Sequence, residues 1–368
     1  MKYNINFQSL AFDKVLPYDG AVECLVKKDD KYFLRLKAPN AGEVVFRYEE
    51  TDHPCVKDSD GIWSCEYTPG TAMNYVQLKV DGVEVITPML PISYGYSRPY
   101  NYVELETGDD FYAVKDVPHG SLRREYYPSS VTGEWESIMV YTPFGYDDSK
   151  EDYPVLYLQH GHGENEVGWS AAGKVNFIMD NLIASGEAVP FVIVMSNGMV
   201  QTHNDLGDRI VDFRLFEKEL VKDIIPFVEG KFRVSREKSK RGMAGLSMGS
   251  LQTCLTAFTN PELFDYLGVF SGFVTDIIQG SELDRPDREK SDNAHLKILD
   301  DADKFNTTFK LFFRSMATDD PFWENFVHDD KMLEEKGIIQ VRKTYAGTHD
   351  WNTWRQSFRD FAKLVFKK

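Results

Sequence analysis

Cysteine is scarce in this sequence, and the few cysteines fit no dense pattern. Only four of the 368 residues are cysteines, and their spacing matches neither a paired Cys-x-x-Cys metal motif nor a disulfide-rich framework. Cys55 and Cys65 flank an expected hairpin, where they would form a disulfide in an oxidising compartment and otherwise stay free thiols. Cys254 falls on the apolar face of an expected helix, so we interpret it as a core residue and not as a nucleophile.

Positive charge is also in deficit. The 42 Lys and Arg residues face 58 Asp and Glu residues, which gives a net charge of −16. Nucleic-acid binding needs a basic surface that neutralises phosphates, and an anionic membrane surface would repel this chain. The composition therefore argues against nucleic acid and against a membrane as partners.

Long apolar runs are absent. No window approaches about 20 consecutive apolar residues, the length that a membrane-spanning helix requires. The first residues hold one Lys but neither an apolar core nor a small-residue cleavage site, so they do not have the pattern of a secretory signal. We expect a cytoplasmic protein, or a secreted one if a leader precedes this sequence. The sequence does not indicate an oligomeric state.

The first ninety or so residues have the pattern of short β-strands. Alternating or β-rich segments cover 32–37, 43–48, 62–67 and 76–80, and clusters of Asp, Asn, Gly and Pro separate them. Short strands at close spacing without helical periodicity predict a small all-β sandwich over residues 1–95. A Pro- and Tyr-rich stretch follows, and we expect a linker over residues 96–115.

From residue 116 to 368 the pattern changes to alternating strands and helices. Such alternation predicts a mostly parallel sheet that helices cover on both faces. Expected strands lie at 155–158, 191–195, 241–244, 266–270, 311–313 and 340–345. Apolar residues at helical spacing predict helices around 175–182, 220–228, 251–258 and 354–365.

The segment Gly245-Leu246-Ser247-Met248-Gly249 matches the G-x-S-x-G elbow of the α/β-hydrolase fold. In that elbow a tight turn between a strand and a helix holds a serine hydroxyl above the sheet, and small residues on either side permit the turn. The pattern alone is a weak signal. Its context supports it, because an expected strand leads into it and an amphipathic helix follows. Ser247 is therefore the expected nucleophile.

A serine nucleophile needs a base, and in this fold the acid and then the histidine follow the serine along the chain. Three histidines follow Ser247. His295 precedes the strand after which the acid should come, and His328 lies within an expected helix, where a solvated side chain is the simpler interpretation. His349 lies in a loop between the last strand and the last helix, so we expect it to be the base.

The acid should follow the strand at 311–313. Asp319 and Asp320 are the only carboxylates in the short loop after it. One of the two is then a turn or helix-cap residue. We favour Asp320 as the acid of the triad and keep Asp319 as the alternative.

The loop after the strand at 155–158 contains His160-Gly-His162-Gly, and it permits two interpretations. In the first, the backbone N–H groups of His162 and Met248 form the oxyanion hole. In the second, His160, His162, Glu164 and Glu166 bind a metal ion, although a metal site needs three or four converging ligands of known geometry. We favour the oxyanion hole and expect neither a metal nor another cofactor.

With these residues in place, the chain resembles carbohydrate esterase family one, which holds feruloyl esterases, acetylxylan esterases and relatives of the enterochelin esterases. The resemblance runs from about residue 117 to the C-terminus and rests on several segments in order. It implies Ser247, Asp320 and His349 as the triad. One departure is Ser250, where the family commonly has a second glycine. The matching segments are 140–146, 153–161, 180–183, 223–227, 244–249 and 347–351.

The resemblance implies a serine esterase acting on plant cell-wall polysaccharide esters, with a feruloyl ester as the favoured substrate. Acetylxylan and a siderophore lactone of the enterochelin type are the alternative substrates. The N-terminal sandwich resembles immunoglobulin-like modules that precede such esterases. A non-enzymatic alternative is a glycan-binding protein in which the sandwich binds sugar and the hydrolase fold is a degenerate scaffold.

Three tryptophans fall near the expected catalytic loops. Trp169, Trp323 and Trp351 lie close to the oxyanion, acid and base loops respectively. In these places they would stack on a phenolic ring or a sugar of the substrate. For each of them, packing at the edge of the core is the alternative.

Overall fold

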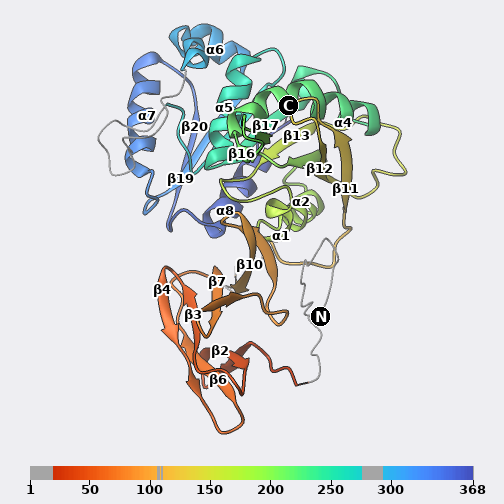
Figure 1. The fold of residues 1–368 in the computed structure, drawn as a ribbon. Coiled ribbons are helices and arrows are strands. Elements are labelled where there is room, and N and C mark those ends of the chain that lie inside the picture. Colours follow the sequence, from red (N-terminus) through yellow and green to blue (C-terminus); the bar gives the residue numbers. More distant parts are fainter. Residues whose placement is uncertain (1–19, 106–107, 109–110, 276–292, 368) are drawn as a thin grey trace. The chain divides into compact units, whose positions relative to one another are not determined.

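The computed structural model describes residues 20–105, 108, 111–275 and 293–367. The chain forms two compact units, residues 1–110 and 111–368 (Figure 1). Each unit is described by itself below. No helix of the described residues is long and apolar enough to cross a membrane.

The N-terminal unit is all-β, as predicted, and consists of two antiparallel sheets around one apolar core. Core side chains come from both sheets, for example Leu34 and Trp63 from one and Phe46 and Val76 from the other. The first sheet has the order β1 (Leu25–Lys28), β2 (Lys31–Lys37), β6 (Ile62–Tyr67), β5 (Val56–Lys57). The second has the order β4 (Thr51–Pro54), β3 (Val44–Tyr48), β7 (Met73–Val80), β10 (Arg98–Glu104), β9 (Ile92–Gly95), and β8 (Val83–Val85) pairs with β7.

The expected linker at 96–115 differs from the structure. Its first part is strand β10, which pairs with both β7 and β9 and places Tyr102 opposite Tyr75. Tyr102 is buried in the unit. The turn between β9 and β10 consists of Tyr96 and Ser97, both with positive φ. Neither is a Gly or Asn, the residues from which a two-residue hairpin turn is usually predicted. The unit therefore extends to residue 110.

The C-terminal unit contains one eight-stranded sheet with the predicted parallel arrangement. Its six central and C-terminal strands are parallel, and β11 and β12 are antiparallel to their neighbours. The order is β11 (Ser121–Pro128), β12 (Trp135–Thr142), β14 (Val192–Ser196), β13 (Val155–Gln159), β17 (Arg241–Leu246), β18 (Tyr266–Phe270), β19 (Leu311–Ala317), β20 (Val341–Tyr345). Strands β13, β14, β17 and β18 are buried along their whole length because helices cover both faces.

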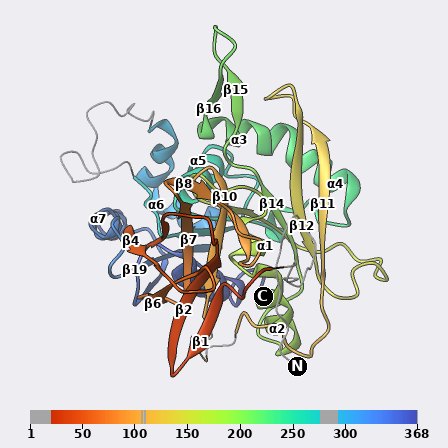
Figure 2. The same cartoon turned by 60° about the horizontal axis from the view of Figure 1, so that its bottom comes forward.

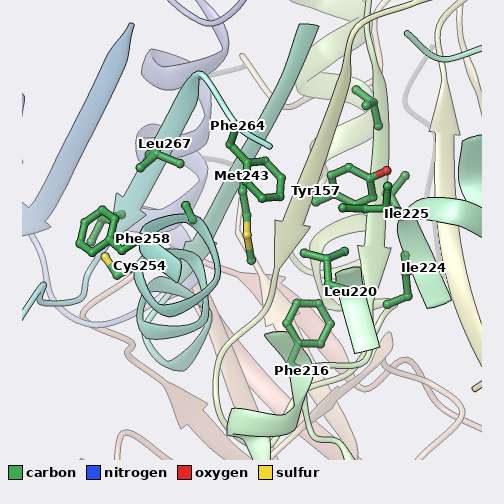
Figure 3. Packing of buried hydrophobic residues seen from close by; sticks show 14 of the residues in the cluster. Tyr157, Phe216, Leu220, Ile224, Ile225, Met243, Cys254, Phe258, Phe264 and Leu267 are labelled. Carbon is green, nitrogen blue, oxygen red and sulfur yellow. The ribbon is translucent and has the colours of Figure 1, made fainter. Parts of the chain in front are cut away.

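One face of this sheet packs against helices that follow β14, β17, β18 and β19. Tyr157 and Met243 of the sheet meet Leu220, Ile224 and Ile225 there (Figure 3). Cys254 belongs to this core, as predicted from the sequence. The helices are α3 (Phe216–Glu219), a π-helical turn over Leu220–Ile224, α4 (Ile225–Lys231), α5 (Met248–Thr259), α6 (Ala302–Thr308) and α7 (Trp323–Lys336).

The opposite face packs against α8 (Trp351–Ala362) and α2 (Val175–Ala184), preceded by the short α1 (Gly168–Ala171). Phe361 of α8 packs against Phe270 and Phe313. Their neighbours Val269 and Phe312 belong to the core on the other face, because successive side chains of a strand point to opposite faces. Asp350 caps the N-terminus of helix α8, and its side chain accepts a hydrogen bond from the Thr353 N–H at 3.0 Å. The start of α8 therefore has a fixed place beside the loop that carries His349.

A hairpin of β15 (Gln201–His203) and β16 (Arg209–Val211) stands out from the C-terminal unit (Figure 2). It follows β14, and its tip exposes Leu206. No strand pattern is recognisable in the sequence of this hairpin, because its strands are only three residues long.

Candidate active site

The turn between β17 and α5 holds Ser247 in a strained backbone conformation. Ser247 has φ 50° and ψ −117°, a combination that L-residues rarely adopt and that costs about 1–3 kcal/mol. The two flanking glycines make the turn possible. A Cβ on Gly245 would lie 2.3 Å from the Gly249 carbonyl oxygen, and one on Gly249 would lie 2.6 Å from the His160 oxygen. The G-x-S-x-G spacing thus follows from backbone contact.

Hydrogen bonds fix the ends of this turn. The Ser247 N–H donates to the Phe270 carbonyl at 2.9 Å, and the Ser250 hydroxyl donates to the Ser247 carbonyl at 2.6 Å. Ser250 is the position where the sequence departs from the pattern that it resembles. Its hydroxyl makes a local hydrogen bond to the Ser247 backbone at the start of α5, whereas Ser247 Oγ bonds to His349.

The structure brings Ser247, His349 and Asp320 together in one hydrogen-bonded row. His349 Nε2 lies 2.9 Å from Ser247 Oγ, and His349 Nδ1 lies 2.8 Å from Asp320 Oδ2. Because a carboxylate only accepts, the bonding pattern assigns the proton to Nδ1 and leaves the Nε2 lone pair for the serine hydroxyl. This is the geometry that activates a serine nucleophile.

Asp320 is held by its position at the end of β19. Its side chain is buried, and its second oxygen accepts a hydrogen bond from the Phe322 N–H at 2.9 Å. The neighbouring Asp319 is exposed and contributes through its backbone, which bonds to Gly347 and Thr348 in the histidine loop. Of the two adjacent aspartates, the structure thus places Asp320 against the imidazole.

Two aromatic rings enclose the imidazole of His349. The ring centroids of Phe322 and Trp354 lie 5.1 Å and 5.2 Å from it. These contacts limit rotation of the imidazole and keep it aligned with both hydrogen-bond partners. The sequence did not single out either residue, because neither carries a motif.

The loop after β13 lies directly against the nucleophile. A Cβ on Gly161 would lie 2.7 Å from Leu246 Cδ1 and 3.4 Å from Ser247 Cβ, so only glycine permits this approach. Among the residues that the structure describes, the backbone N–H groups of His162 and Met248 have no hydrogen-bond acceptor within the chain. Two such donors beside a serine are what an oxyanion hole requires.

Three of the four candidate metal ligands of this loop, His160, Glu164 and Glu166, have separate hydrogen-bond partners. His160 Nδ1 donates to the Gly161 carbonyl at 2.7 Å, and His160 Nε2 accepts from the Gly198 N–H at 2.8 Å, so both ring nitrogens are used. Burial lowers the pKa of His160 to about 4, and the ring is neutral. Glu166 bonds to Ser137 and Arg124. Over the described ranges, no group of three or more His, Cys, Asp or Glu side chains converges as a metal site.

Two of the three predicted stacking tryptophans are in the core, which corrects the expectation of a substrate platform. Trp169 and Trp351 are each 1% exposed and pack edge to face with ring centroids 5.3 Å apart. The Trp169 indole donates to the Gln159 carbonyl at 2.8 Å. Their rings fill the space between α1, α8 and the sheet, where a substrate does not reach. Trp323 is partly exposed at the start of α7 and packs on Phe326.

Glu164 is a site residue that the sequence reasoning considered only as a metal ligand. Its carboxyl is buried and accepts a hydrogen bond from the Gly161 N–H at 2.9 Å and another from Trp351. Desolvation by burial raises the pKa of Glu164 to about 8, against these two hydrogen bonds. The buried position of Glu164 could not be predicted from the neighbouring sequence, because its partner Trp351 lies far along the chain.

Comparisons with known proteins agree with this site. Residues 129–363 match the family model described as "Putative esterase", and the chain belongs to this esterase family. Over 224 residues the chain is 38% identical to an endo-1,4-beta-xylanase/feruloyl esterase of Xylanibacter ruminicola, a match that covers 59% of this chain and 31% of the relative. The chain thus corresponds to about a third of that longer protein.

Solved structures share the fold. The ferulic acid esterase of Anaeromyces mucronatus, bound to ferulic acid, has a TM-score of 0.58 at 20% identity and covers 70% of this chain and 95% of its own. The enterobactin esterase of Shigella flexneri has a TM-score of 0.63 at 12% identity and covers 93% and 95%. At these identities the likeness concerns the fold, which is the predicted α/β-hydrolase fold for the C-terminal unit.

Proposed function

We propose that this chain is a feruloyl esterase that hydrolyses feruloyl esters of plant cell-wall polysaccharide. The observation that carries the proposal is the continuous row from Ser247 Oγ through His349 to Asp320, with bonds of 2.9 and 2.8 Å. Membership of an esterase family and 38% identity to a protein named for feruloyl esterase activity support the substrate class.

In this reaction Ser247 Oγ attacks the acyl carbon while its proton passes to His349 Nε2. The tetrahedral intermediate carries a negative oxygen, which the N–H groups of His162 and Met248 stabilise. Its collapse breaks the bond to the sugar oxygen, and that oxygen takes the proton from His349. A water molecule then attacks the acyl-enzyme with His349 as base, ferulate leaves, and the proton returns to Ser247. Asp320 holds the imidazole in its tautomer throughout.

We also propose that the reaction needs no metal and no other cofactor, because the side chains and backbone supply nucleophile, base and oxyanion donors. A chelator should therefore leave turnover unchanged. His162→Ala should have a small effect, since the proposed role uses only its backbone N–H. Loss of activity with a chelator and recovery with zinc would return the loop after β13 to the metal interpretation.

Rates on three esters test the substrate class. Methyl ferulate, acetylated xylan and a catecholate siderophore lactone are assayed side by side, with Ser247→Ala as the inactive control. The proposal expects the highest kcat/KM on the feruloyl ester. A higher value on acetylated xylan would make the chain an acetylxylan esterase. A preference for the lactone would favour the siderophore alternative, whose anionic substrate fits poorly with a net charge of −16.

For the N-terminal unit we propose an immunoglobulin-like module, as the sequence resemblance implies. Two antiparallel sheets packed face to face around an apolar core support this. Trp63 and Tyr67 are buried and fill that core, so they are not a sugar-binding surface. This burial counts against the glycan-binding alternative at these two positions.

A further inference from the structure

Glu164 bonds to both peptide groups that flank Gly161 in the loop after β13. Its side-chain Oε2 accepts from the Gly161 N–H at 2.9 Å, and its own N–H donates to the Gly161 carbonyl at 3.3 Å. The same carbonyl accepts from His160 Nδ1. The carbonyl of Gly161 and the N–H of His162 belong to one planar trans peptide, so fixing the carbonyl also fixes the direction of that N–H.

The side chain of Glu164 is in turn tied to a distant element. Its carboxyl accepts a hydrogen bond from Trp351, the first residue of α8, and is only 6% exposed. Trp351 is packed against Trp169 and Trp354 and has little freedom to move. Helix α8 starts two residues after His349, so Glu164 connects the oxyanion loop to the segment that carries the base.

We propose that Glu164 is the positioning residue of the oxyanion hole. Its carboxyl, held by Trp351, fixes the Gly161 N–H and thereby the backbone of Gly161, so that the following Gly161–His162 peptide directs the His162 N–H toward the acyl oxygen. This inference rests on the proposed esterase function. Glu164 does not touch the reacting atoms and acts through the backbone of Gly161. Its removal should therefore reduce transition-state stabilisation more than substrate binding.

The charge of Glu164 matters because a fixed anion beside the oxyanion hole would oppose the negative charge of the intermediate. Burial raises the pKa of Glu164 to about 8, so its carboxyl is neutral at neutral pH. The ionisable groups around it are His160, His162 and Glu166 on its own segment and His349 and Asp350 before α8. Helix α1 and the Ser247 elbow contribute no charged group, and no neighbouring charge shifts the pKa of Glu164.

Three variants test the proposal, with kcat and KM on methyl ferulate measured between about pH 5 and 10. Glu164→Ala leaves two buried donors unpaired and should lower kcat about tenfold to a hundredfold with little change in KM. Glu164→Gln mimics the protonated acid and should restore most of kcat near neutral pH. It should also lose the fall in kcat that the wild type shows as pH rises through about 8. The matched control is Glu166→Gln, a buried carboxylate of the same segment that bonds to Ser137 and should keep the wild-type profile.

Thermal unfolding gives a second readout. The pKa of Glu164 is higher in the folded state than its ordinary value of 4.5, so the folded state binds this proton more tightly. Between about pH 4.5 and 8 this group should therefore make the free energy of unfolding fall as pH rises. Glu164→Gln should lose that part of the slope and keep the part due to Glu219, whose pKa burial raises to about 7.

The outcomes separate this inference from the proposed function. If Glu164→Ala keeps the wild-type kcat, or if Glu164→Gln keeps the alkaline fall, the positioning role is wrong while the esterase proposal stands. If Ser247→Ala is as active as the wild type, the esterase mechanism itself fails. If Glu164→Ala does not fold, the pH profile of Glu164→Gln alone decides whether Glu164 has the positioning role.

Discussion

Positive φ angles at non-glycine residues occur in both units and have a different consequence in each. In the N-terminal unit they lie in two-residue turns between antiparallel strands: Asp29–Asp30, Glu49–Glu50, Tyr96–Ser97, and Asp81 followed by Gly82. This is the geometry of the two-residue turns that match the twist of a hairpin. In the C-terminal unit Ser247 combines positive φ with ψ −117° between a parallel strand and a helix.

The comparison distinguishes positive φ angles that only reverse the chain in a hairpin from the strained conformation that holds a reactive side chain. A hairpin turn needs its φ values only to reverse the chain, and the side chains of Asp29 and Asp30 point into solvent. Ser247 is held by contacts of Gly245 and Gly249 and by a bond to Phe270, so the surrounding structure over-determines it. A strained residue indicates a functional site where it carries a reactive group and is fixed on every side.

The largest expected effect is that of Ser247→Ala. Removing the nucleophile should lower kcat on methyl ferulate by about 10⁴-fold or more, because the remaining groups supply little of the rate. Circular dichroism should show an unchanged fold. The matched change in the N-terminal unit is Asp29→Gly, which should leave kcat unchanged and alter stability by at most about 1 kcal/mol. Equal loss of activity in both variants would remove the distinction between the two kinds of strain.

The next effect distinguishes the two adjacent aspartates. Asp320→Asn should lower kcat by about 10³- to 10⁴-fold, since an amide no longer holds the imidazole in the required tautomer. Asp319→Asn should remain within a few-fold of the wild type, because the contacts of Asp319 are made by its backbone. The two variants are compared by kcat on the same ester. The opposite ranking would move the acid by one residue.

A smaller effect concerns the thiols of the N-terminal unit. Continuing the register of β5 and β6 places Cys55 opposite Cys65, and both are free. The Cys55 thiol donates a hydrogen bond that lowers the pKa of Cys65 and raises that of Cys55. With glutathione disulfide, the Cys65 thiolate should attack first, Cys55 should displace the bound glutathione, and two reduced glutathiones should leave.

The resulting disulfide should stabilise the N-terminal unit by roughly 2–3 kcal/mol, because it closes a short loop in the unfolded chain. Thiol titration of the denatured protein should show two thiols fewer, and thermal unfolding should shift upward. Cys65→Ser is the control that should show neither change. An unchanged thiol count after oxidation would exclude the cross-link. Formation of the disulfide would favour the secreted alternative over the predicted cytoplasmic location, because thiols stay reduced in the cytoplasm.

Much of this protein could be predicted from the sequence, because the decisive signals are local. The strands around residues 155, 192 and 266 consist mostly of apolar residues, as expected for strands that helices cover on both faces. Ser247 has its glycines as neighbours in the chain, and the order of serine, acid and histidine restricts the remaining choices. The structure places His349 within hydrogen-bond reach of both Ser247 and Asp320.

The tertiary structure decided what depends on partners far apart in the chain. Trp169 and Trp351 are close in sequence to the expected oxyanion and base loops, but they belong to α1 and α8, which bring the two rings against each other and bury them. The segment after residue 95 has the composition of a linker, yet its pairing with β7 makes it a strand. Glu164 acquires its role only when folding removes its carboxyl from water and places it between Gly161 and Trp351. Burial and long-range hydrogen bonds are properties of the folded chain, and no local pattern encodes them.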